Sequence, residues 1–212
     1  MSRISASILS FYFEAKEGKE SEEVMIKKIN HALLEKKSEF HILHLDIMDG
    51  KFVTHTAFTP SQCRRIATPH KKEAHFMVVD YKKYIQDFLL IVDMFIVQQE
   101  VIRRDFPETI AYLHKNHKFV GIAIDPETPI AEIKYLDQID LVLVMAVHPG
   151  LPGQKFMESA VRKIKKLQEI RKKQGLRFQI EVDGGINNIT RKKCIDAGVD
   201  LLVEGSYFFK GY

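Results

Sequence analysis

Short apolar runs alternate with segments of helical spacing along this 212-residue sequence, and the alternation predicts an α/β protein, a single (β/α)₈ TIM barrel. Two further observations favour that fold. The length suits one barrel domain, so we expect residues 1–212 to form a single domain. The polar residues that stand out fall at the ends of predicted strands, where parallel barrels place their functional groups.

The strands are predicted from short apolar runs rich in β-branched and aromatic residues. Residues 141–147 form a continuous run of the kind found in strands buried on both faces. The strand before it is ended by Asp125 and Pro126, because an Asp-Pro pair favours the start of a turn. The predicted strands span residues 4–9, 44–50, 73–79, 94–97, 119–124, 141–147, 178–182 and 201–203.

The helices are predicted from apolar residues spaced three and four apart. Thr59 followed by Pro60 is typical of a helix start. In the first helix, residues 21–37, the side chains expected to face inward are Val24, Ile26, Ile29, Leu33 and Leu34. The other helices are expected at residues 59–67, 81–90, 106–116, 130–136 and 190–197, with a long one that follows Gly150 and ends at Lys173.

Composition and charge argue against several classes of protein. The 32 Lys and Arg exceed the 28 Asp and Glu by only four and are scattered, so we expect no nucleic-acid partner and a slight preference for an anionic substrate. Residues 88–97, the most apolar run, are interrupted by Asp93 and are too short to span a membrane. Cys63 and Cys194 lack metal-ligand spacing and no secretory signal is recognisable, so we expect a cytoplasmic protein.

The stretch from His44 to Gly50 carries the first chemical signal. In an extended strand, His44, Asp46 and Met48 share one face while Leu45 and Ile47 share the other. A buried aspartate needs a partner, so this row indicates either a bound cation or a hydrogen-bonded His/Asp pair at a hydrated strand end.

Two further strand ends extend that signal. His75 and Met77 share a face of the third strand, and Asp183 closes the seventh. If His44, Asp46, His75 and Asp183 converge, they form a mixed nitrogen and oxygen site for one divalent ion, Zn²⁺, Fe²⁺, Mn²⁺ or Co²⁺. The alternative is that each is an ordinary polar group with its own hydrogen bonds.

Three glycine-containing turns follow the last three predicted strands. They lie at Gly150 to Gly153, at Gly184 and Gly185, and at Gly205 with Ser206. Glycine lets backbone N–H groups approach an anion closely, and barrels often hold phosphate on their last loops. The pattern therefore predicts a phosphate site.

Motifs along nearly the whole chain resemble, in order, those of the ribulose-phosphate 3-epimerase family. The motifs lie at residues 4–10, 44–50 with Phe52 and Val53, 75–77, 125–129, 144–150, 153–156 and 181–186. The resemblance implies a (β/α)₈ barrel that interconverts D-ribulose 5-phosphate and D-xylulose 5-phosphate with one bound divalent metal ion.

Carried over position by position, the resemblance makes His44, Asp46, His75 and Asp183 the metal ligands, and Asp46 and Asp183 also the acid/base pair. Inversion at C3 removes a proton beside the C2 ketone and returns one to the opposite face, so it needs two proton carriers. A metal ion stabilises the negative charge that develops on the enediolate oxygens.

The resemblance also implies a set of substrate-binding residues. The methionines among them would form a polarisable wall that shields the intermediate from water, although the alternative for methionine is simple barrel filling. The full set is Ser7, Met48, His75, Met77, Met145, Gly153, Gly184, Gly185, Gly205 and Ser206.

Two departures from the family concern the outer ring of helices. The stretch between Ser7 and His44 is longer than usual, and no segment after Ser206 matches the family's last helix. We therefore expect a longer first helix or a partner subunit to cover an apolar flank, and a homo-oligomer.

Other departures lie beside the site and leave the substrate open. Gln98 stands where His is usual, His148 where an acidic residue or Asn is usual, Thr59 where Gly is common, and Leu151-Pro152 in a loop that normally has Phe and a small residue. The alternatives are a D-allulose 6-phosphate 3-epimerase and a non-catalytic sugar-phosphate-binding relative. Related decarboxylases and aldolases are disfavoured because the segment from Asp46 to Asp49 lacks their lysine.

Overall fold

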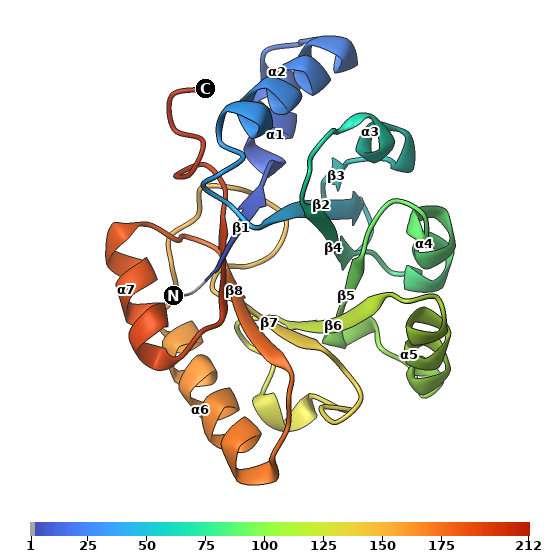
Figure 1. Ribbon diagram of the computed structural model, residues 1–212, viewed down its shortest axis with the longest axis vertical. Helices are drawn as coiled ribbons and strands as arrows, with labels where there is room; N and C mark the ends of the chain where they lie inside the picture. Colours follow the sequence, from blue (N-terminus) through green and yellow to red (C-terminus); the bar gives the residue numbers. More distant parts are fainter. Residues whose placement is uncertain (1–2) are drawn as a thin grey trace.

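Eight parallel strands close into a barrel in the computed structural model, which describes residues 3–212 (Figure 1). The barrel closes because β1 pairs in parallel with both β2 and β9, and the predicted fold class is confirmed. β3 is a short antiparallel addition to β2. The strands are β1 (Arg3–Ser7), β2 (Ile42–Asp49), β3 (Thr56–Ala57), β4 (Lys71–Met77), β5 (Met94–Gln98), β6 (Phe119–Ile124), β7 (Leu141–Met145), β8 (Gln179–Asp183) and β9 (Leu201–Glu204).

The helices surround the barrel (Figure 1). They are α1 (Leu9–Glu17), α2 (Glu22–Glu35), α3 (Pro60–Arg65), α4 (Tyr81–Phe88), α5 (Phe106–Lys115), α6 (Ser159–Gln174) and α7 (Asn188–Ala197), with 3₁₀ turns η1 (Gln99–Val101) and η2 (Ile130–Glu132). The predicted start of α3 is confirmed, because Thr59 and Gln62 form a capping box. Within residues 3–212, every helix is too short or too polar to cross a membrane.

The structure corrects three details of the predicted helices. The predicted helix at 130–136 is only the turn η2, and Tyr135 beyond it has a left-handed φ of 61°, which a helix cannot contain. Val24 and Leu34 are 41% and 62% exposed instead of facing inward. The long helix after Gly150 begins only at Ser159. The residues of α2 that are buried are Met25, Ile26, Ile29, Ala32 and Leu33.

The extra residues between Ser7 and His44 form a separate helix, α1, rather than lengthening the first predicted helix. The C-terminal residues lie against this region, beside α1 and α2 in Figure 1. The Phe209 ring packs edge-on against Phe11 at 5.2 Å, and the Tyr212 hydroxyl donates to Glu35 at 2.6 Å. Aromatic packing between α1 and the C-terminal segment therefore covers part of this flank of the barrel.

The barrel interior has an apolar and a polar side. β5, β6, β7 and β9 contribute an apolar cluster, whereas β1, β2, β4 and β8 bury polar side chains. The apolar set is Ile96, Ala123, Leu141, Leu143, Met145, Val147, Leu201 and Val203. The polar set includes Ser5, His44, Glu73 and Glu181, all at most 1% exposed. Buried polar groups require partners, so a functional site is expected on the polar side.

Three aspartates link neighbouring strands at the end of the barrel where the strands begin. Asp93, Asp140 and Asp200 each directly precede a strand, and each carboxylate accepts a hydrogen bond from a main-chain N–H of the strand before it. In return, the main-chain N–H of each aspartate donates to the carbonyl oxygen of the strand residue whose N–H its carboxylate accepts. The partner residues are Lys72, Val120 and Ile180, whose nitrogens lie 2.9, 2.8 and 2.7 Å from the carboxylates. This repeated contact supports the register on which the site depends.

We expect Asp200→Ala to lower the free energy of unfolding by about 1–3 kcal/mol, because it leaves the Ile180 N–H without its acceptor and removes the ion pair between Asp200 and the Arg171 guanidinium at 2.6 Å. Urea unfolding would measure the change. Asp137→Ala, at an exposed position, is the control. Equal unfolding midpoints for the two variants would contradict this role.

Candidate metal centre and substrate pocket

Strand register brings the four predicted ligands together at the C-terminal end of the barrel. β1 aligns Ser7 with His44, and β4 aligns His75 with Asp46. Asp183 is the last residue of β8. One ligand atom from each of His44, Asp46, His75 and Asp183 lies within 4.8 Å of the others. The structure therefore forms a compact cluster of two imidazoles and two carboxylates.

The two imidazole rings each direct one nitrogen toward Asp46. His44 Nε2 lies 3.6 Å and His75 Nδ1 3.8 Å from Asp46 Oδ1, and both rings are fully buried. Neither of these two nitrogens has a hydrogen-bond partner. Buried ring nitrogens without partners, beside two carboxylates, fit a divalent cation with mixed nitrogen and oxygen ligands.

Asp46 stays ionised inside the barrel because of its neighbours. The Ser7 hydroxyl donates to Asp46 Oδ2 at 2.8 Å, leaving Oδ1 to face the rings. Burial opposes ionisation, but the His44 and His75 side chains outweigh it and hold the pKa of Asp46 well below its usual range. Burial also opposes the charged form of His44, but the nearby carboxylates of Asp46 and Glu73 outweigh it and raise the pKa of His44.

Asp183 has the opposite electrostatic environment. Burial and the nearby negative charge of Asp46 raise the pKa of Asp183 to about 7. The metal-free cluster therefore pairs a carboxylate that stays ionised with one that binds its proton far more tightly. Two carboxyl groups with separated pKa values are a common arrangement in acid/base catalysis.

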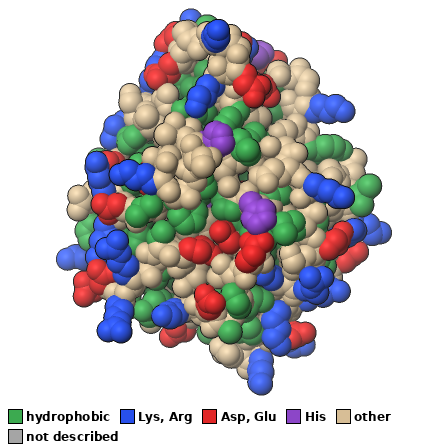
Figure 2. Space-filling view, turned by 180° about the vertical axis from the view of Figure 1, so that it is seen from behind, with side chains coloured by type: hydrophobic (Ala, Val, Ile, Leu, Met, Phe, Trp, Pro, Cys, Tyr) green, Lys and Arg blue, Asp and Glu red, His purple; other side chains and the backbone are tan. Residues whose placement is uncertain are grey.

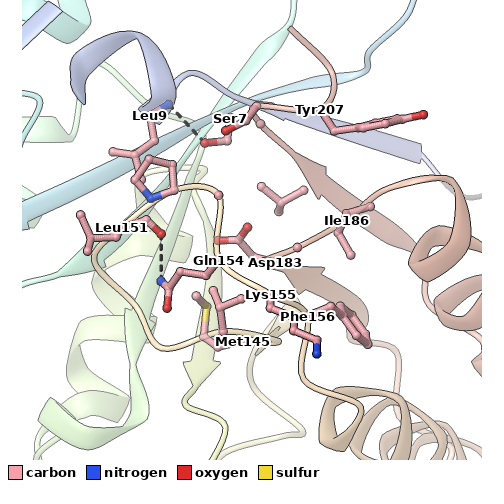
Figure 3. A pocket seen from close by; sticks show the side chains of 18 of the residues that line it. Ser7, Leu9, Met145, Leu151, Gln154, Lys155, Phe156, Asp183, Ile186 and Tyr207 are labelled. Atoms are coloured by element: carbon pink, nitrogen blue, oxygen red, sulfur yellow. Dashed lines mark hydrogen bonds between the residues drawn. The ribbon is translucent and has the colours of Figure 1, made fainter. Parts of the chain in front are cut away.

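A pocket of about 690 Å³ opens above the cluster (Figure 3). In Figure 3 Asp183 lies near its centre, with Ser7 on one side and Met145 on the other. The predicted site residues that line it are Ser7, Asp46, Met77, Met145, Gly153, Asp183, Gly184, Gly185, Gly205 and Ser206. His44, His75 and Met48 are buried and are not part of its lining.

Glycine is required where two of the pocket turns meet. Gly185 has a φ of 64°, and a Cβ there would lie 2.6 Å from the main-chain nitrogen of Phe156. The loop that carries Phe156 is braced by the Gln154 amide, which donates to the carbonyls of His148 and Leu151 at 2.7 and 2.9 Å. Gly185 thus allows the two loops to approach closely.

Of the three polar residues that support the cluster, sequence reasoning placed Gln98 beside the site but did not identify Glu73 or Glu181. Glu73 contacts His44, Gln98 contacts His75, and Glu181 lies beside Glu73 with both carboxylate oxygens unpartnered. Burial and the charge of Glu73 raise the pKa of Glu181. Strand periodicity offered a signal, because Glu73 shares a face with His75 and Glu181 shares one with Asp183.

Basic side chains on the face in Figure 2 lie mainly around its outline, and acidic side chains and histidines lie nearer the middle. The cations there do not gather into one continuous patch. This distribution agrees with the scattered lysines of the sequence. The absence of a nucleic-acid partner stays a prediction.

The barrel, with a histidine and carboxylate cluster that could hold a metal ion at the carboxyl ends of its strands and a glycine-lined pocket above it, defines the class of TIM-barrel enzymes. Residues 3–209 match the Ribulose-phosphate 3 epimerase family, and the chain belongs to that family.

Curated relatives in plants and bacteria support this membership. The chloroplastic ribulose-5-phosphate-3-epimerase of Arabidopsis thaliana is 36% identical over 174 residues, which cover 79% of this chain and 61% of that protein. The ribulose-phosphate 3-epimerase of Bacillus subtilis (strain 168) is 33% identical over 211 residues, which cover 97% of this chain and 91% of the relative.

Solved structures show the fold alone. A tryptophan synthase α-subunit from Pyrococcus furiosus aligns with a TM-score of 0.67 at 14% identity, covering 99% of this chain and 91% of that one. A 3-hexulose-6-phosphate synthase aligns with a TM-score of 0.65 at 13% identity, covering 96% of this chain and 90% of that one.

We expect metal affinity to fall steeply below neutral pH. The raised pKa values of Asp183, about 7, and of His44 mean that both hold protons in the metal-free protein, and ligation must displace them. Titration calorimetry with Mn²⁺ should show affinity falling about tenfold per pH unit for each displaced proton.

The control for this titration is Asp183→Asn, which removes one of the titrating groups and should reduce the pH dependence accordingly. A wild-type affinity that does not change between about pH 6 and pH 8 would contradict the assignment.

Proposed function

We propose that this protein interconverts D-ribulose 5-phosphate and D-xylulose 5-phosphate by inverting C3, with one divalent metal ion bound. The observation that carries the proposal is the pair Asp46 and Asp183, which share a four-residue cluster with two histidines and line the pocket. Membership of the family and the names of its curated relatives support the same reaction.

The metal would be held by His44, Asp46, His75 and Asp183. Zn²⁺, Fe²⁺, Mn²⁺ and Co²⁺ all suit such ligands, and a bound cation supplies electrostatic stabilisation for negative charge on the substrate oxygens. Ser7 orients Asp46 through its hydrogen bond at 2.8 Å.

Asp46 and Asp183 would be the two proton carriers. They project from different strands, β2 and β8, so a substrate held between them can lose a proton to one and receive one from the other. Each carboxylate then serves as base in one direction and acid in the reverse direction. Met77 and Met145, which line the pocket, would keep water from the intermediate.

The substrate phosphate would lie on the glycine turns. Gly153, Gly184, Gly185, Gly205 and Ser206 line the same pocket, and their backbone N–H groups can approach an anion without side-chain obstruction.

The direct test is deuterium incorporation at C3 of D-ribulose 5-phosphate in D₂O, followed by NMR, with protein loaded in turn with each of the four metals. Incorporation together with formation of D-xylulose 5-phosphate would support the proposal. Turnover of D-allulose 6-phosphate alone would change the substrate, and inactivity on both would leave a binding role.

We expect Asp46→Asn and Asp183→Asn each to lower the rate of epimerisation by about 10²–10⁴-fold, because each removes one proton carrier. The carboxylate that remains can still exchange the C3 proton of the epimer that faces it. Deuterium NMR started from each pure epimer should therefore show exchange in one epimer only, and a different one for each variant.

Near-wild-type epimerisation by either variant, measured with metal content confirmed by atomic absorption, would exclude that aspartate as a proton carrier.

We expect Gly185→Ala to raise KM by about tenfold or more, since a Cβ 2.6 Å from the Phe156 nitrogen must displace the opposite loop of the pocket. Gly175→Ala is a matched control: its φ of 65° equals that of Gly185 within a degree, but a Cβ there meets nothing within 4 Å.

Both variants should lose about 1–2 kcal/mol of stability from the left-handed backbone. Steady-state kinetics and thermal melting separate the two effects. Equal KM values for the two alanine variants would contradict the role of Gly185 in the pocket.

A further inference from the structure

We infer that Glu73 and Gln98 are positioning residues that hold the two histidine ligands in the ring states the metal requires: Glu73 keeps the proton of His44 on Nδ1, and Gln98 keeps that of His75 on Nε2. The inference rests on the metal site of the proposed function. It adds two residues that do not line the pocket above the cluster.

The contact between Glu73 and His44 is built by the strand register. β2 and β4 place His44 directly opposite Glu73, and His44 Nδ1 lies 2.8 Å from Glu73 Oε1. The Ser5 hydroxyl donates to the same oxygen, and all three side chains are at most 1% exposed. A carboxylate can only accept, so the Nδ1 atom must carry a proton and Nε2 is left to bind a metal.

The contact of His75 is reversed. Its Nε2 lies 3.0 Å from the amide nitrogen of Gln98, on the neighbouring strand β5, and its unpartnered Nδ1 faces Asp46. An amide has both a donor and an acceptor, so it can donate to Nε2 or, turned about its last bond, accept from Nε2–H. When Nδ1 binds a metal, the ring proton must be on Nε2, and the buried, unpartnered Gln98 Oε1 is the acceptor available for it.

The two positioning residues, Glu73 and Gln98, therefore differ in charge. The carboxylate of Glu73 makes His44 a more basic ligand, whereas the neutral amide of Gln98 orients His75 without adding charge. A neutral partner on the second ring limits the negative charge buried beside Asp46 and Asp183.

The test measures metal affinity in variants that keep side-chain size. Glu73→Gln still accepts from Nδ1–H but removes the charge, and Gln98→Met removes the acceptor for Nε2–H. We expect each to weaken Zn²⁺ binding by about 10–100-fold in competition with a chelating dye. Gln98→His, which restores an acceptor, should recover most of the affinity.

Glu204→Gln is the matched control. Glu204 is also 1% exposed, but its carboxylate pairs with Arg191 rather than with either ring. Thermal melting without metal shows which variants are folded. If Glu73→Gln is not folded, Glu73→Asp is measured in its place.

Nitrogen NMR of the Zn²⁺-loaded protein gives a second readout, independent of activity. The ring protons should lie on Nδ1 of His44 and Nε2 of His75, and the Nδ1–H signal of His44 should move upfield in Glu73→Gln. The reverse ring states, or a Zn²⁺ affinity in both variants equal to that of Glu204→Gln, would overturn the inference while leaving the epimerase proposal intact. A wild-type protein that binds no metal would overturn both.

Discussion

Burial of the Asp46 carboxylate is the constraint on which the rest of the site depends. An ionised carboxylate inside a protein is unfavourable unless charged and hydrogen-bonding partners surround it, and breaking such a buried arrangement costs about 3–5 kcal/mol. Here the partners come from three strands: Ser7 donates to one oxygen, and His44 and His75 face the other. The other ring nitrogen of each histidine contacts Glu73 or Gln98. The polar side of the barrel is thus one connected set of contacts.

That arrangement gives two chemically similar residues different properties. Asp46 lies between imidazoles and stays ionised, whereas burial and the charge of Asp46 raise the pKa of Asp183 to about 7. Neither pKa shift follows from residue type. Both follow from which strand each aspartate ends and what the neighbouring strands place beside it.

The scaffold keeps these neighbours in register at both ends of the barrel. Asp93, Asp140 and Asp200 link consecutive strands where they begin, and close approach at Gly185 joins two loops where strands end. A shift of one residue between β2 and β4 would turn His75 away from Asp46, because successive side chains point to opposite faces. The chemistry therefore depends on backbone contacts remote from it.

The sequence by itself determined the barrel, the four cluster residues and the glycine turns, because apolar periodicity and motifs can be read directly from the order of residues along the chain. It missed α1, and it assigned Leu34 to the core, because three- and four-residue spacing does not fix how a helix is rotated against its neighbours. Only the tertiary structure decided that Glu73 and Gln98 touch the histidines and that Met48 is not part of the pocket lining. Those facts depend on register between strands distant in sequence, and on side-chain packing, which no single segment encodes.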